Sequence, residues 1–168
     1  MVSLTRFRQV ADLDADTMDA YDRVCGVDAL MQEATVPGRS LGDVFAACQA
    51  AYAGLGFVQN EWHNHHQGGA TGYAGRTCKA TPGCGFPVLE ENWALRVREI
   101  LGQEVHFGSA FAWNPSAPGV KSEDTFILLP DGRREIVSNT PELPRVNLEA
   151  VLGRATEVVK SGMMGSGF

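Results

Sequence analysis

The chain has 168 residues, of which 44% are hydrophobic and 20% are charged, and its formal net charge is -6. This length fits one ordinary domain, which buries roughly 70% of its unfolded surface and holds a core without disulfides or metals. The acidic balance argues against a nucleic-acid partner, which requires a basic surface. No apolar stretch reaches about 18 residues and the N-terminus lacks a signal-peptide region, so we expect no membrane contact and a cytoplasmic location.

The first third of the chain predicts a strand followed by two helices. Alternating apolar and polar residues favour a strand at residues 4–10. A helix is predicted over residues 16–34 and ends before Pro37 and Gly38. Ser40 caps a second helix, with Asp43 in a partial capping box, and Gly54 and Gly56 mark its end. The apolar stripes consist of Met18, Tyr21, Val24, Cys25 and Met31 in the first helix and of Leu41, Val44, Phe45, Cys48, Tyr52 and Leu55 in the second.

The remainder of the chain predicts several short strands. Strands are expected within residues 57–66 and 70–79, a loop at 82–85, and either a helix or a strand at 93–100. Further strands are predicted at 109–113 and 125–129, the second fully buried, and residues 130–133 form a hairpin turn into 135–138. We therefore expect an α+β fold, with one domain over residues 1–160 and a flexible tail at 161–168.

Three of the four histidines lie within four consecutive positions. His63, His65 and His66 precede Gly68 and Gly69, where the backbone can approach a ligand closely. Imidazole is the commonest transition-metal ligand and titrates near neutral pH. On a strand, His63 and His65 would share one face and His66 the other, so convergence of all three requires a bend. This geometry favours surface or loop positions for His63 and His65.

The four cysteines are interpreted as free thiols because no secretion signal is present. Cys25 and Cys48 fall in helical patterns and are expected to pack as small hydrophobic residues. Cys78 and Cys84 are separated by five residues, a longer spacing than in a zinc knuckle. A structural zinc site that joins them to histidines is the lesser alternative.

Five short motifs occur in an ordered set. They are residues 4–6 (LTR), 37–38 (PG), 66–73 (HQGGATGY), 111–115 (FAWNP) and 121–125 (KSEDT). In this order and spacing, the chain resembles the metal-dependent aminopeptidase superfamily with the pita-bread fold, which includes methionine aminopeptidase, Xaa-Pro aminopeptidase, prolidase and creatinase. The resemblance runs over about residues 1–145 and is strongest to Xaa-Pro aminopeptidase and prolidase. It implies a pita-bread-like half domain, with an antiparallel curved sheet and two helices packed on it.

The resemblance implies a site for two divalent metals, but the ligands are only partly present. His66 stands at the position of the family's ligating His, and Glu123 at that of its last Glu. Asn114 replaces the other Glu, Ser3 replaces one Asp, and the remaining Asp position falls before the first residue. An amide oxygen can bind a cation but cannot bridge two of them as a carboxylate does. We therefore expect no dinuclear centre, and at most one Mn, Zn or Co ion held by His66, Glu123 and Asn114.

The resemblance also implies roles for neighbouring residues. His63 or His65 would shuttle protons, and Tyr73, at the position of a substrate-contacting His, would donate a hydrogen bond. Substrate would contact Gly68, Gly69, Trp113 and Lys121. Simpler interpretations remain open: Phe111, Trp113 and Tyr73 as packing residues, His66 and Glu123 as a hydrogen-bonded pair, and Lys121, Ser122 and Asp124 as a polar entry to a strand.

Two functional hypotheses follow. The first is a weakly active or non-catalytic relative of Xaa-Pro aminopeptidase and prolidase that binds a small peptide. The alternative is an active metallo-aminopeptidase-like or dipeptidase-like hydrolase, whose site is completed by a homodimer or a partner chain. Loss of the first half of the family domain would uncover apolar surface, so we expect a two-fold homodimer.

Overall fold

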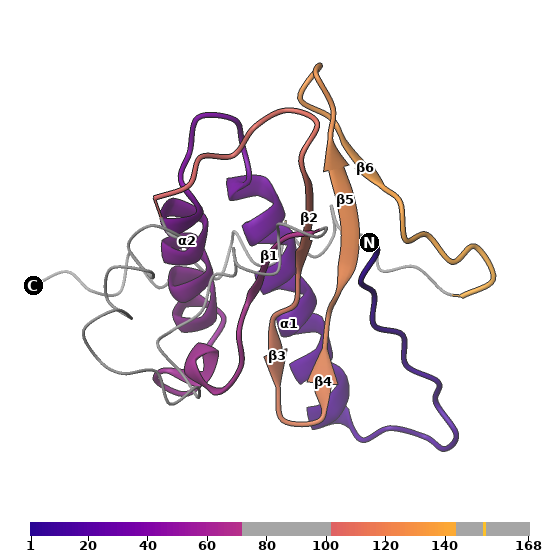
Figure 1. The fold of residues 1–168 in the computed structure, drawn as a ribbon. Coiled ribbons are helices and arrows are strands. Elements are labelled where there is room, and N and C mark those ends of the chain that lie inside the picture. The colour runs from indigo at the N-terminus through magenta and orange to yellow at the C-terminus, as the bar shows by residue number, and fades with distance from the viewer. Residues whose placement is uncertain (72–101, 144–152, 154–168) are drawn as a thin grey trace, which may run out of the picture.

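The computed structural model of the chain describes residues 1–71, 102–143 and 153. Two helices, α1 (Ala15–Ala34) and α2 (Leu41–Gly54), pack against each other and against one face of a small antiparallel sheet (Figure 1). The helices precede most of the strands in the chain. The described part of the protein therefore has the α+β architecture that the order of predicted elements indicated.

The sheet is built from four described strands in the order β1-β2-β5-β6, all antiparallel. The strands are β1 (Gly68–Ala70), β2 (Ala110–Trp113), β5 (Asp124–Leu128) and β6 (Arg134–Ile136). Between β2 and β5, the two-residue strands β3 (Ser116–Ala117) and β4 (Val120–Lys121) form a separate hairpin. The predicted strands at 109–113 and 125–129 and the following hairpin are confirmed, although Ile127 and Leu129 are only partly buried, so the second strand is not fully buried as predicted.

Both helices begin with side-chain caps, of which the cap at Ser40 was predicted. Asp14 accepts a hydrogen bond from the Thr17 backbone N–H at 2.7 Å, which satisfies one of the free donors at the start of α1. At α2, the Ser40 hydroxyl accepts from the Asp43 N–H at 3.1 Å, and the Asp43 carboxylate accepts from the Ser40 N–H at 2.9 Å. The predicted capping box is therefore complete in both directions.

The core lies between the two helices and the sheet. Every residue of the predicted α2 stripe is buried, whereas the assignment of Met18 to the apolar face of α1 is wrong, because Met18 is 45% exposed. Phe111 of β2 lies opposite Phe126 of β5, and both rings face the helices. Each such side chain contributes roughly 1.5–3 kcal/mol by burial, which holds β2 and β5 against the helices.

The predicted strand at residues 4–10 is wrong. β5 is hydrogen-bonded to β2 on one side and to β6 on the other, so neither edge is free to add the N-terminal segment as a strand. The segment is instead attached at the start of β5, where the Thr5 N–H donates to the Glu123 carbonyl at 3.1 Å and the Ser3 N–H donates to Thr125 Oγ1 at 2.9 Å. Figure 1 shows this arm descending beside the sheet.

The predicted strand within residues 57–66 is also wrong, since this segment contains the 3-10 helix η1 (Glu61–Asn64). Asn60 adopts a left-handed conformation, with a φ of 63°, that interrupts an extended chain. Trp62 then packs edge-on against Phe45 with ring centroids 5.5 Å apart. The next strand, β1, begins at Gly68 rather than at residue 70.

Several predicted segments lie outside the described residues. They are most of the strand at 70–79, the loop at 82–85, the undecided element at 93–100 and the tail at 161–168. Within the part that is described, no helix combines the length and apolar character needed to cross a membrane.

Candidate functional site

Asn114 and Glu123 meet at one end of the sheet. Asn114 directly follows the last residue of β2, and Glu123 directly precedes the first residue of β5. Because Trp113 pairs with Asp124 across these antiparallel strands, the residue after Trp113 lies beside the residue before Asp124. The Asn114 amide Nδ2 donates to Glu123 Oε1 at 3.4 Å. The structure thus brings together two of the three residues that the family resemblance assigned to a metal.

The Glu123 carboxylate is surrounded by protein donors. The Thr5 hydroxyl donates to Oε2 at 2.6 Å, and the Lys121 ammonium lies 3.2 Å from the same oxygen. Burial of the side chain, which is 11% exposed, opposes ionisation, but the hydrogen bonds and the Lys121 charge outweigh it and lower the pKa of Glu123. Glu123 therefore carries its negative charge at neutral pH, and a cation of the protein itself already neutralises it.

The buried amide of Gln67 shapes the loop that carries the histidines. Its Nε2 donates to the carbonyl oxygens of Trp62 at 2.8 Å and His65 at 2.7 Å. Its Oε1 accepts from the Tyr52 hydroxyl at 3.3 Å, and its backbone carbonyl accepts from the Asn114 N–H at 3.2 Å. One fully buried side chain therefore ties the loop to α2, while its backbone places the loop beside the end of β2.

The histidines divide into two positions along this loop. His65 and His66 stack on each other with ring centroids 4.3 Å apart, and His65 Nδ1 lies 2.5 Å from the His66 carbonyl oxygen. His63 is exposed on η1, and its ring centroid lies 5.2 Å from that of Trp62. The exposed position of His63 matches the surface alternative that strand geometry favoured, although the element that carries it is a 3-10 helix.

Gly68 and Gly69 are buried within the sheet. Gly68 has a φ of +93°, and a Cβ built on it would lie 2.1 Å from the Ala112 carbonyl oxygen. The glycine therefore permits β1 to approach β2, which is a structural reason for its presence. Trp113 is fully buried, and its indole Nε1 donates to Thr35 Oγ1 at 2.8 Å, so the structure places it in the core. Tyr73 lies outside the described residues.

The donors around Glu123 do not fit the pair of divalent metals that the resemblance implies. In the described ranges, no group of three or more His, Cys, Asp or Glu side chains is placed to hold a metal ion. The Lys121 ammonium lies where a cation would approach Glu123, and Asn114 brings no charge. The Oδ1 atom of Asn114 is buried and has no hydrogen-bond partner among these residues, which leaves one acceptor for a ligand donor.

A second polar cluster was not predicted from the sequence. Asp28 of α1 is only 3% exposed and accepts hydrogen bonds from the Ser122 hydroxyl at 2.5 Å and from Gln32 Nε2 at 3.1 Å. Burial raises the pKa of Asp28 to about 6, against the opposing effect of these hydrogen bonds. The sequence contains one signal of a buried carboxylate, because Asp28 falls on the apolar face of α1, between Val24 and Met31.

The cysteines that the structure describes are inert packing residues, as predicted. Cys25 and Cys48 are both buried free thiols. Burial raises the pKa of Cys25 to about 12 and raises that of Cys48 as well, so neither forms a thiolate at neutral pH. Cys78 and Cys84 lie outside the described residues, together with the zinc alternative that involves them.

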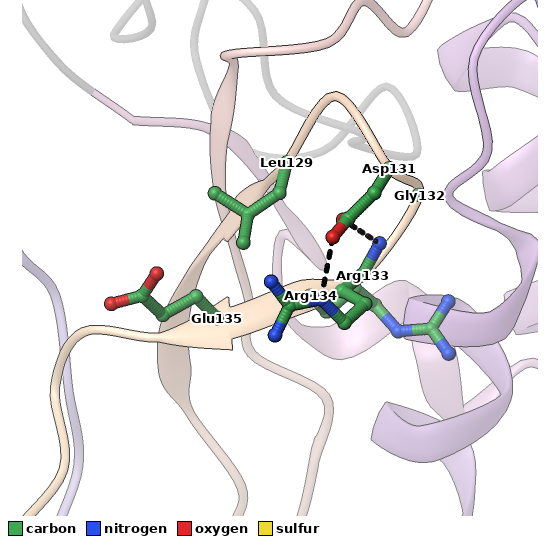
Figure 2. Close-up of a pocket in the computed structure, with 6 residues that line it drawn as sticks. All are labelled: Leu129, Asp131, Gly132, Arg133, Arg134 and Glu135. Atoms are coloured by element: carbon green, nitrogen blue, oxygen red, sulfur yellow. Dashed lines mark hydrogen bonds and ion pairs between the residues drawn. The ribbon is translucent and has the colours of Figure 1, made fainter.

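A shallow pocket lies on the β5–β6 hairpin, at the opposite end of β5 from Glu123 (Figure 2). Its guanidinium groups are already paired: Arg133 Nε lies 2.6 Å from Asp131 Oδ2, and Arg134 forms an ion pair with Glu33. Figure 2 shows the Asp131 carboxylate between the side chain and the backbone N–H of Arg133. Neither guanidinium group of this pocket is therefore free to bind an anionic ligand.

Comparison with known proteins assigns no family to the chain. No protein-family model matches it, and no curated protein matches its sequence. The chemistry must therefore be inferred from the site itself, which offers a neutralised carboxylate at Glu123, a partly exposed ammonium at Lys121 and a buried amide oxygen at Asn114.

Proposed function

We propose that the chain is a non-catalytic, peptide-binding relative of the Xaa-Pro aminopeptidases and prolidases. The observation that carries this proposal is that Thr5, Lys121 and Asn114 all contact the Glu123 carboxylate. A divalent cation would have to displace the Lys121 ammonium from a largely buried carboxylate before it could bind. It would gain no second carboxylate there, because Asn114 is neutral, so the balance opposes a dinuclear centre.

The arrangement of the sequence motifs supports the pita-bread-like half domain. The motif at residues 111–115 covers the end of β2, and the motif at 121–125 covers the start of β5. The motif that begins at His66 leads into β1, whose partner is β2. Three separate motifs therefore meet at one end of the sheet, as a common binding site requires.

The groups at this end suit a small peptide. An ammonium has three donors, so Lys121 can bind Glu123 and a peptide carboxylate together. The unpaired Asn114 Oδ1 can accept a hydrogen bond from the N-terminal ammonium of a dipeptide, which would satisfy a buried acceptor. A free Xaa-Pro dipeptide supplies a carboxylate at one end and ammonium N–H donors at the other, while its proline nitrogen carries no hydrogen.

Calorimetric titration of the full chain with a Xaa-Pro dipeptide tests the binding function. We expect binding without added metal, and at least tenfold weaker binding in Lys121→Met, while Arg133→Met on the distant hairpin serves as the control. Absence of any binding at millimolar dipeptide would contradict the peptide-binding function.

A turnover assay distinguishes the hydrolase alternative from this proposal. The full chain is incubated with the same dipeptide and Mn²⁺ or Co²⁺, beside a His66→Ala variant. The proposal expects no hydrolysis by either protein. Metal-dependent hydrolysis that is lost in His66→Ala would instead support the active enzyme completed by a homodimer or a partner chain.

We also propose that the protein forms a homodimer through its N-terminal arm. Large apolar side chains are exposed along the arm and the first turn of α1: Met1, Val2, Leu4, Phe7, Val10, Leu13 and Met18. A two-fold interface would cover such a patch on both copies. Light scattering after size exclusion should show a dimer at micromolar concentration, dissociated by Val10→Glu but not by Val58→Glu, which lies in the connection between α2 and η1. A wild-type monomer would contradict this proposal.

A further inference from the structure

The contact between Asp28 and Ser122 joins helix α1 to the turn that carries Glu123. Asp28 lies in the second half of α1 and is almost fully buried, and the Ser122 hydroxyl donates to its Oδ2 at 2.5 Å. Ser122 itself is held by its backbone N–H, which donates to the Pro115 carbonyl at 3.1 Å. A change in the strength of this contact would therefore reach residues 121–124, which include Lys121 and Glu123.

The charges that face Asp28 are mainly negative. Glu123 and Asp124, from the start of β5, both oppose ionisation of Asp28, and the thiols of Cys25 on α1 and Cys48 on α2 lie within electrostatic range. Lys121 is the cation of this turn, but it pairs with Glu123. No ion pair to Asp28 is present in the described part of the chain, so its charged form is stabilised only by the Ser122 and Gln32 hydrogen bonds.

We propose that Asp28 and Ser122 form a pH-dependent tether between α1 and the turn at residues 121–124, which tightens when Asp28 takes up a proton. The hydrogen bonds from Ser122 and Gln32 favour the ionised carboxylate. A protonated Asp28 costs less to bury between α1 and the turn, however, and no longer repels Glu123 and Asp124, and these two effects outweigh the weaker hydrogen bonds. The tether concerns the folded chain itself, so it does not depend on whether the site binds a peptide.

The direction of the pH effect follows from the raised pKa. In the folded chain the pKa of Asp28 is raised from its usual 3.8 to about 6. Protonation of Asp28 therefore stabilises the closed form, in which Asp28 is buried against Ser122, relative to an open form in which it is exposed. This stabilisation is complete below pH 3.8 and is lost as the pH rises through about 6. The turn should therefore be held more firmly at pH 5 than at pH 7, with a population of the open form roughly tenfold larger at the higher pH.

Hydrogen exchange of the full chain at pH 5 and pH 7 tests the tether. Exchange times are corrected for the intrinsic rate at each pH, and peptides that cover residues 116–126 and 22–32 are compared with those from Asp28→Asn. Wild type should show about a tenfold change in protection of both segments. Asp28→Asn should lose this change, while Asp131→Asn, an exposed carboxylate on the distant hairpin, should keep it.

An equal pH response in wild type and Asp28→Asn, or no response in wild type, would overturn the proposal. A second measurement on the wild-type chain remains decisive if the variant does not fold. The ¹³C shift of the Asp28 carboxyl, followed by NMR across pH 3–8, should titrate near pH 6 and should be accompanied by shifts of the Ser122 amide. A midpoint at or below pH 4, or a silent Ser122 amide, would contradict the tether.

Discussion

The Thr5 hydroxyl donates a 2.6 Å hydrogen bond to Glu123 Oε2, although the two residues are 118 positions apart. The backbone N–H of Thr5 also donates to the Glu123 carbonyl at 3.1 Å. This double contact attaches the N-terminal arm to the start of β5 and satisfies one oxygen of the Glu123 carboxylate. A segment outside the sheet therefore takes part in setting the charge state of a residue at the proposed site.

Replacement of Thr5 by Val should raise the pKa of Glu123 towards its usual value. The variant removes the side-chain donor and leaves the backbone hydrogen bond, so the free energy of unfolding should fall by about 1 kcal/mol. Carboxyl NMR measures the pKa, and urea denaturation measures the stability. Asn139→Ala, at an exposed position after β6, is the control, and an unchanged Glu123 pKa in Thr5→Val would count against the assigned hydrogen bond.

Replacement of Gly68 by Ala should be severely destabilising. A Cβ at Gly68 would meet the Ala112 carbonyl oxygen at 2.1 Å, whereas Gly132 also has a positive φ, +83°, but a Cβ added there would meet no atom within 4 Å. The strained backbone alone should cost about 1 kcal/mol in Gly132→Ala, and the clash should increase the loss to about 3 kcal/mol or more in Gly68→Ala. Equal urea midpoints for the two variants would show that β1 does not pack closely on β2.

Replacement of Gln67 by Leu should loosen the histidine loop. The hydrogen bonds of the Gln67 side-chain amide to Tyr52, Trp62 and His65 would be lost inside the core. This loss should reduce the free energy of unfolding by about 2–4 kcal/mol. A double-mutant cycle with Tyr52→Phe isolates the contact to α2. We expect a coupling energy of about 0.5 kcal/mol or more, and strictly additive losses would exclude a direct interaction.

Replacement of Asp28 by Asn should stabilise the fold at pH 8 and have little benefit at pH 4. The raised pKa means that Asp28 is neutral in the folded chain at low pH and is a buried charge above about 6. Removal of that charge should add about 1–3 kcal/mol to the free energy of unfolding at pH 8. Urea denaturation across this range measures the effect, with Asp131→Asn as control, and a loss of stability that is equal at both pH values would refute it.

The sequence predicted the elements whose cause is local. The capping box of Ser40 and Asp43 and the apolar stripe of α2 lie within short windows, and both are present in the structure. The turn at Asp131 and Gly132 likewise needs only the residues around it. Such signals do not depend on what the rest of the chain does.

The wrong predictions concern segments whose conformation depends on residues elsewhere in the chain. The alternation at residues 4–10 suggested a strand, but β2 and β6 already occupy both sides of β5. The loop around His65 is bent by Gln67, whose role depends on Tyr52 of α2. At the site, the resemblance assigned Asn114 and Glu123 to the same metal, but no pattern in the sequence indicated that Thr5 and Lys121 would contact the Glu123 carboxylate.

Titration of the metal-free full chain with Mn²⁺, followed by electron paramagnetic resonance and calorimetry, tests most directly whether Glu123 is closed to metal ions. With Thr5, Lys121 and Asn114 around this carboxylate, we predict no stoichiometric binding at micromolar Mn²⁺ and the same result for Glu123→Gln. Two bound Mn²⁺ ions per chain with a spin-coupled signal, abolished in Glu123→Gln, would contradict the non-catalytic assignment.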